Sequence, residues 1–152
     1  MGRLVGIAFR EKPRGPMRML DVACVTSTGG IAGDFRGRPG RRQVTVLARE
    51  GWERACGELG LALPWTARRA NLFVEGVELP GSTGTMLLVG NAVLEVTGES
   101  APCARMDEVA DGLREALGKE WRGGVTCRVV HGGEIRLGDR VTLFDPGAAL
   151  RA

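Results

Sequence analysis

Short apolar runs, each followed by a turn rich in glycine or proline, recur along the whole sequence. The chain of 152 residues holds 24 glycines and 7 prolines, which interrupt helices but suit tight turns. This pattern favours strands joined by turns over a bundle of helices. Apolar residues make up 43% of the chain, which is enough for a buried core and too many for a disordered segment. We therefore expect one folded domain over residues 1–152.

The apolar runs predict a mainly β chain with seven or eight strands, at residues 3–9, 18–26, 43–48, 67–79, 86–89, 92–97, 125–131 and 134–144. Glycine-containing turns predict hairpins at 90–91 and 132–133, and a further turn at 138–139 inside the last strand segment. Amphipathic helices are expected over 50–61 and 107–118, where apolar residues recur at helical spacing. This number and spacing of strands is typical of a closed or nearly closed β-barrel, or of a sandwich, with two or three short helices.

One of the four cysteines stands apart from the others. Cys24, Cys56 and Cys127 fall within apolar strands or on the apolar face of a helix, and we expect them in the core. Cys103 follows a strand and a Gly/Ser turn, and it stands just ahead of the best-formed predicted helix. Free amide groups at a helix N-terminus favour the thiolate, the form that acts as a nucleophile or metal ligand. The alternative is that Cys103 is a small buried apolar residue.

The segment 27–42 is the least regular part of the sequence, with five glycines and four arginines. Glycine lets backbone amides approach an anion, and arginine holds phosphate through paired hydrogen bonds. The segment is therefore an anion-binding loop or, alternatively, a solvated basic loop. A second polar cluster, Arg68, Arg69 and Asn71, stands at the start of the strand at 67–79. There Asn71 could also simply hydrogen-bond a neighbouring loop.

Several classes of function are disfavoured. The net charge of +3, with only Phe35 beside the arginine run, is too little for a nucleic-acid interface. No CxxC or CxxH pair suggests a zinc site, and His131 is the only histidine, which excludes a three-histidine metal site. No apolar run is long enough for a membrane span or a signal peptide. We expect a cytoplasmic protein with reduced thiols that binds neither nucleic acid nor membrane.

Four segments, taken in order, resemble the MOSC domain, which is named after the C-terminal domain of molybdenum cofactor sulfurases. They are GIAGDFRGRPGRRQVTVLARE, RRANLFVEG, GNAVLEVTGESAPCARMDEVADGLREAL and RGGVTCRVVHGGEIRLGDRV, and they extend from about residue 30 to residue 141. The resemblance implies a β-barrel like the barrel domain of pyruvate kinase. It also implies that the protein binds the molybdenum cofactor, a pterin (molybdopterin) that carries a phosphate.

The resemblance also implies roles for particular residues. The family cysteine that ligates molybdenum in the amidoxime-reducing members falls on Cys103, which would be both the metal ligand and the catalytic residue. Arg69 and Asn71 are similar to the Arg-x-Asn motif that lines the pterin pocket, and Asp34 to the aspartate of the Gly-Asp loop. The implied cofactor-binding set is Arg69, Asn71, Asp34, Arg38, Arg42 and Thr97. For the arginines at 38, 42 and 68, a solvated surface charge is an equal alternative.

Two departures from the family pattern bear on the pocket. Phe35 and Arg36 stand where many members carry histidine. The sequence also holds no second N-terminal barrel domain of the kind found in the larger members. The pocket would then be completed by a homodimer, by the chain's own loops, or not at all.

Three hypotheses for function follow. The first is an enzyme that reduces N-hydroxylated substrates at a Cys103-ligated molybdenum cofactor, with electrons from a separate donor protein, because no flavin, haem or iron–sulfur motif is present. The second is a sulfur carrier that receives a persulfide on Cys103 from a sulfur-donor protein and delivers it for the assembly of a metal–sulfur cluster or cofactor. The third is an interaction domain whose pocket has lost its function.

Overall fold

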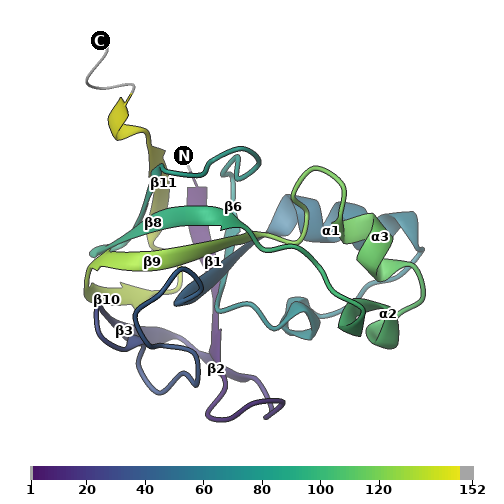
Figure 1. Ribbon diagram of the computed structural model, residues 1–152, viewed down its shortest axis with the longest axis horizontal. Helices are drawn as coiled ribbons and strands as arrows, with labels where there is room; N and C mark the ends of the chain where they lie inside the picture. The colour runs from purple at the N-terminus through teal and green to yellow at the C-terminus, as the bar shows by residue number, and fades with distance from the viewer. Residues whose placement is uncertain (1, 148–152) are drawn as a thin grey trace.

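Seven strands close into a β-barrel in the computed structural model, which describes residues 2–147 (Figure 1). In order around the barrel they are β11 (Arg140–Phe144), β7 (Met86–Val89), β8 (Ala92–Glu99), β9 (Val125–His131), β5 (Val44–Ala48), β6 (Leu72–Glu75) and β1 (Gly2–Phe9). Pairing of Gly2 with Val141 joins β1 to β11 and closes the ring. Neighbours are antiparallel except β5 and β6, which run parallel. The predicted mainly β, closed barrel is therefore confirmed.

A small second sheet corrects one predicted hairpin. Strands β3 (Val22–Thr26), β4 (Gly30–Ile31) and β10 (Gly133–Arg136) form this three-stranded sheet, while β2 (Arg18–Leu20) extends the barrel sheet beside β1. The predicted strand at 18–26 is thus divided between two sheets. The hairpin at 90–91 is confirmed by the β7–β8 pair, but the one at 132–133 is wrong, because β10 pairs with β3. The turn at 138–139 is confirmed: it separates β10 from β11, and the Asp139 amide donates to the Arg136 carbonyl at 3.0 Å. Local turn signals identified the strand ends but not the distant partner strand.

Alternation along the strands decides which side chains enter the core. Cys127 is fully buried inside the barrel, and Cys56 is buried beneath the helical side of the molecule, as predicted. Cys24 is exposed, so its predicted place in the core is wrong. On β3 the buried positions are Ala23 and Val25, and the strand therefore turns the intervening cysteine outward.

Within the described residues, three short helices gather beside the barrel (Figure 1). The first, α1 (Arg49–Glu58), buries Trp52, Ala55 and Cys56 as its apolar spacing predicted. The predicted helix at 107–118 is instead two helices, α2 (Arg105–Val109) and α3 (Leu113–Leu117). Ala110 is extended and Gly112 has a φ of 86°, which ends one helix and begins the next. Among residues 2–147, no helix has the length and hydropathy to span a bilayer.

The predicted strand at 67–79 is also shorter than expected. A 3-10 turn, η1 (Trp65–Arg68), precedes it, and Arg69 ends that turn with a φ of 65°, a left-handed conformation rare outside glycine. The strand itself, β6, covers only Leu72–Glu75. The polar residues at its start therefore lie in a bend and not in a strand.

One buried amide organises the irregular segment 27–42. Gln43, which is 2% exposed, donates from Nε2 to the carbonyls of Ser27 and Gly37, both at 3.0 Å. Its Oε1 accepts a hydrogen bond from the Val129 amide of β9 at 2.8 Å. The segment also crosses itself so closely that a Cβ on Gly37 would lie 1.8 Å from the Gly29 carbonyl oxygen. These contacts fix the loop that carries Asp34 and the arginine run.

An ion pair between α1 and the turn before β9 predicts a pH dependence of stability. Arg122, whose side chain is 6% exposed, contacts Glu58 at 2.9 Å, and Lys119 contacts it at 3.2 Å. Hydrogen bonds from Arg122 and then Lys119 lower the pKa of Glu58. A carboxyl with a lowered pKa stabilises the fold above its ordinary pKa, and this contribution is lost as the pH falls through the lowered value.

We therefore expect Glu58→Gln to reduce the free energy of unfolding at pH 7, and the difference from wild type to shrink as the pH falls through the lowered pKa of Glu58. Urea denaturation at several pH values measures this difference. Glu78→Gln, at an exposed position, is the control and is expected to show no such trend. A difference that stays constant down to acid pH would contradict the assignment.

Candidate functional site

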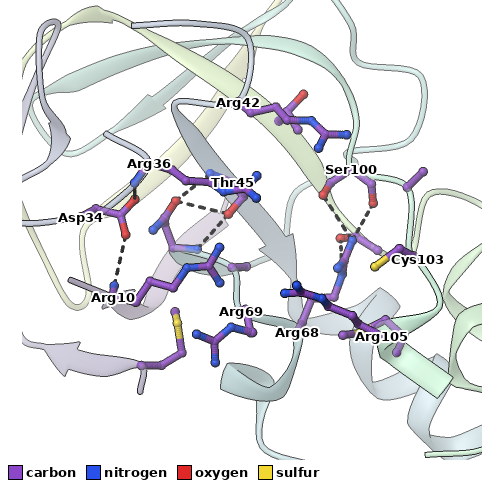
Figure 2. A pocket seen from close by; sticks show the side chains of 17 residues that line it. Arg10, Asp34, Arg36, Arg42, Thr45, Arg68, Arg69, Ser100, Cys103 and Arg105 are labelled. Atoms are coloured by element: carbon purple, nitrogen blue, oxygen red, sulfur yellow. Dashed lines mark hydrogen bonds between the residues drawn. The ribbon is translucent and has the colours of Figure 1, made fainter. Parts of the chain in front are cut away.

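A cavity of about 230 Å³ lies where several barrel strands and the α2 segment meet (Figure 2). Arg10, at the end of β1, and Thr45 of β5 line it from the barrel. Arg69 and Asn71 line it from the bend before β6, and Cys103 lies in the segment between β8 and α2. The closed barrel therefore brings together residues that are far apart in the sequence.

Positive charge dominates the cavity. One carboxylate, that of Asp34, faces six guanidinium groups, those of Arg10, Arg36, Arg42, Arg68, Arg69 and Arg105. Burial lowers the pKa of Arg10 most, and the neighbouring guanidinium groups, first that of Arg69, lower it further. Burial and then Arg105 likewise lower the pKa of Arg69. Like charges at close range repel one another, so the cavity is suited to an anion that carries more than one charge.

Arg69 has an unsatisfied donor at this site. Its Nη2 donates to the carbonyl of Gly15, but its Nε is buried without a hydrogen-bond partner among the described residues. Buried polar groups are nearly always paired in folded proteins. The backbone of Arg69 is also held in the left-handed conformation, and such strain gathers at functional sites. An anionic group in the cavity would supply the missing acceptor.

Arg68 makes hydrogen bonds to the protein backbone. Its Nη2 donates to the Ser100 carbonyl at 2.8 Å, and its Nε donates to the Gly123 carbonyl at 3.0 Å (Figure 2). Burial is the main cause of its lowered pKa, which the charge of Cys103 raises in part. The alternative of a solvated surface charge is therefore wrong for Arg68.

Cys103 is exposed at the cavity, so the alternative of a buried apolar residue is wrong. The helix that follows it is not the long one that the sequence predicted, because α2 has only five residues. Positive charge near the sulfur therefore comes from arginine side chains, and a long helix dipole does not contribute. Burial raises the pKa of Cys56 and of Cys127, which makes both of those thiols poor nucleophiles at neutral pH.

Asn71 and Asp34 line the cavity but also hold its walls together. Asn71, which is 6% exposed, accepts a hydrogen bond from the Thr45 amide at 3.0 Å and donates to the Ala8 carbonyl at 3.2 Å. Asp34 accepts hydrogen bonds from the amides of Arg10 at 3.1 Å and Arg36 at 3.3 Å. Both residues therefore tie neighbouring segments to the end of β1 or β5.

The other predicted cofactor-binding residues divide into two groups. Arg42 lines the cavity, but Arg38 and Thr97 are not among the residues that line it. Thr97 instead donates from Oγ1 to the Arg41 carbonyl at 2.6 Å and so anchors the basic loop to β8. A contact of Arg38 or Thr97 with a cofactor stays a prediction.

Sequence reasoning missed several lining residues, among them Arg10, Met17, Ser100 and Arg105. The position of Arg105, two residues after the cysteine, is a signal that could have identified it. Arg10 and Met17 stand in or beside the β1–β2 loop and belong to no motif. This loop forms one wall of the cavity, and the bond from Arg69 to Gly15 ties it there.

The sequence and the fold are similar to those of several known proteins. The MOSC domain profile matches residues 28–142. The YuaD protein from Bacillus subtilis has a TM-score of 0.77 and 19% sequence identity, and the match covers 95% of this chain and 97% of that one. YiiM from Geobacillus stearothermophilus has a TM-score of 0.73 and 18% identity, covering 97% and 77%, respectively. YiiM from Escherichia coli has a TM-score of 0.67 and 18% identity, covering 93% and 69%. No protein of curated function matches the sequence.

Proposed function

The chain belongs to the MOSC domain family, and from this premise we propose that its arginine-lined cavity binds the molybdenum cofactor with Cys103 as the protein ligand to the metal. One observation carries the proposal: an exposed thiol and six arginines line the same cavity. Thiolate is a soft ligand suited to a metal–sulfur centre. Guanidinium groups suit the phosphate of the cofactor.

The residues present fit this group. The unpaired Nε of Arg69 offers a donor to the ligand, and Arg10 and Arg105 add charge beside it. When bound, the cofactor would supply the oxygen-atom transfer by which an N-hydroxylated substrate is reduced, with electrons from a separate donor protein. The chain's own residues would hold the phosphate, anchor the metal through Cys103, and attract an anionic or polar substrate to the cavity.

Metal and pterin content tests the proposal. Protein purified without oxygen from cells that make the cofactor is expected to hold stoichiometric molybdenum and pterin, and Cys103→Ala is expected to lose the molybdenum. Arg69→Gln is expected to reduce the pterin content while the circular dichroism spectrum stays that of wild type. Arg3→Gln, at an exposed position outside the cavity lining, is the matched control. If neither metal nor pterin is found in the wild type, the proposal is wrong.

The exposure of Cys103 favours a second function, that of a sulfur carrier. Its thiolate would attack the outer sulfur of a donor persulfide, and the donor would return to its thiol while the sulfur moves to Cys103. Incubation with a cysteine desulfurase and its substrate is then expected to add the mass of one sulfur atom to the Cys103 peptide, removable by a reductant. No such mass on Cys103 after repeated incubation would count against this function.

A further inference from the structure

Arg68 joins two chain segments that meet beside Cys103. Besides its bonds to the carbonyls of Ser100 and Gly123, its Nη2 lies 3.2 Å from the Ser100 hydroxyl. The side chain thus binds two separate segments through two of its nitrogen atoms. Arginine suits this role because its donors are fixed in one plane.

The two segments are packed together at this point. A Cβ on Gly123 would lie 2.8 Å from the Ser100 carbonyl oxygen and 3.2 Å from Nη2 of Arg68, so position 123 leaves no room for a side chain. The Ser100 amide also donates to the Gly124 carbonyl at 2.8 Å. Residues 100–103 are therefore held at their first residue, and beyond it Ala101 and Cys103 are exposed while Pro102 is half-buried.

We propose that Arg68 is a positioning residue, which holds the segment 100–103 so that the sulfur of Cys103 faces the arginine-lined cavity (Figure 2). This inference rests on the proposed role of Cys103 as the reacting group. It assigns Arg68 no contact with the cofactor or substrate. Arg68 acts through the backbone of Ser100, and its own charge is a secondary contribution.

The placement of the sulfur has a consequence that does not require the cofactor. At a thiol that faces clustered arginines, the rate with an anionic reagent relative to that with a neutral one of similar size is higher than at a thiol in neutral surroundings, because the field of the cavity concentrates anions. Iodoacetate and iodoacetamide are such a pair. The ratio of their rate constants at a given cysteine therefore reports the charge around that sulfur.

The chain supplies its own reference thiol. Cys24 is exposed on β3 and does not line the cavity, whereas Cys56 and Cys127 are buried. Alkylation of the cofactor-free full chain at pH 7 and low salt, followed by peptide mass spectrometry, gives both ratios in one sample. In the wild type we expect the ratio of iodoacetate to iodoacetamide rate constants at Cys103 to exceed that at Cys24 by about tenfold.

Variants of Arg68 test the positioning role. Arg68→Lys keeps the charge but cannot donate to both segments in the same geometry, so we expect its ratio at Cys103 to fall to within about twofold of that at Cys24. Arg42→Met is the matched control, since it removes a lining charge and makes no hydrogen bond to residues 100–103 among the described residues. Arg42→Met is expected to keep most of the wild-type excess of the iodoacetate-to-iodoacetamide ratio at Cys103 over that at Cys24. Circular dichroism and thermal denaturation show that each variant is folded.

Two results would overturn the inference. One is a folded Arg68→Lys protein that keeps the wild-type ratio, and the other is an equal loss in Arg68→Lys and Arg42→Met, which would show that only charge matters. If Arg68→Lys does not fold, Gly123→Ala replaces it, because the added methyl group displaces Ser100 and removes no arginine. An unchanged ratio in folded Gly123→Ala would also overturn the inference. Because the assay uses cofactor-free protein, a failure of the proposed cofactor binding leaves its result intact.

Discussion

Gly37→Ala is expected to lower the free energy of unfolding by about 3 kcal/mol, because the added methyl group would meet backbone atoms that cannot move aside. Its Cβ would lie 1.8 Å from the Gly29 carbonyl oxygen and 2.7 Å from the carbonyl carbon. Gly37 does not have a positive φ, so the cost is steric and does not come from backbone conformation. Relief of the clash requires the loop 27–42 to open, which would also displace its lining residues Asp34, Arg36 and Arg42.

The partner glycine of the same crossing is the control for this prediction. A Cβ on Gly29 would meet only the Thr26 hydroxyl, at 3.0 Å, and a hydroxyl can rotate or shift. Gly29→Ala is therefore expected to cost less than about 1 kcal/mol. Urea denaturation monitored by tryptophan fluorescence compares the two variants. If both are equally stable, the crossing is looser than the structure shows.

Gln43→Leu is expected to cost about 3–4 kcal/mol for a different reason. The substitution keeps the volume nearly constant but leaves the Val129 amide and the carbonyls of Ser27 and Gly37 without their partner. Buried polar groups that lose their partners cost about 1–3 kcal/mol each, and partial exposure to water reduces the sum. Arg38→Ala, at an exposed position of the same loop, is expected to change stability by less than about 0.5 kcal/mol.

The two loop variants should not act independently. Gln43 donates to the carbonyl of Gly37, so opening the crossing at Gly37 already removes part of what Gln43 contributes. We expect the double variant to lose at least about 1 kcal/mol less than the sum of the two single losses. Strict additivity would show that the amide and the crossing stabilise separate parts of the loop.

Local patterns predicted the strands of the barrel because each one is a short run rich in apolar residues, which alternate between buried and less buried positions in β7 and β8. β5, β7, β8 and β9 all lie close to their predicted bounds. The partner of β10 could not be predicted in this way, since its pairing with β3 joins distant parts of the chain. Hydrogen-bonding partners of a strand depend on the closed barrel and not on the strand's own sequence.

The apolar spacing over 107–118 correctly predicted most of the buried residues but wrongly predicted one continuous helix. Met106, Leu113 and Leu117 are buried as the helical spacing predicted, although Val109 is 42% exposed. Two short helices around Gly112 keep the same apolar residues inward, so periodicity alone did not reveal the break. Gly112 was the signal in the sequence for that break, because a glycine inside a helical pattern often marks a position that needs a positive φ.

Lining residues of the candidate site that belong to a sequence motif were predicted. Lining residues that the fold brings to the cavity from outside any motif were missed. Cys103 and Arg69 lie at the cavity, on the segments that the sequence singled out. Arg10 reaches the same cavity from the end of β1, and no pattern in its neighbourhood marks it. A charge cluster drawn from separate strands becomes visible only once the barrel is closed.

The junction of β1 with β11 has a consequence for how the chain is made. During synthesis β1 emerges first, but its partner β11 is produced only after all the other described strands. Until then the edge of β1 at Gly2 and Arg3 has no partner, since β2 pairs only with Ile7–Phe9, and interior residues such as Leu4 cannot be fully enclosed. Nascent chains of this kind fold slowly and associate readily through open strand edges. Translation that stops before β11 would therefore release an open sheet and no barrel.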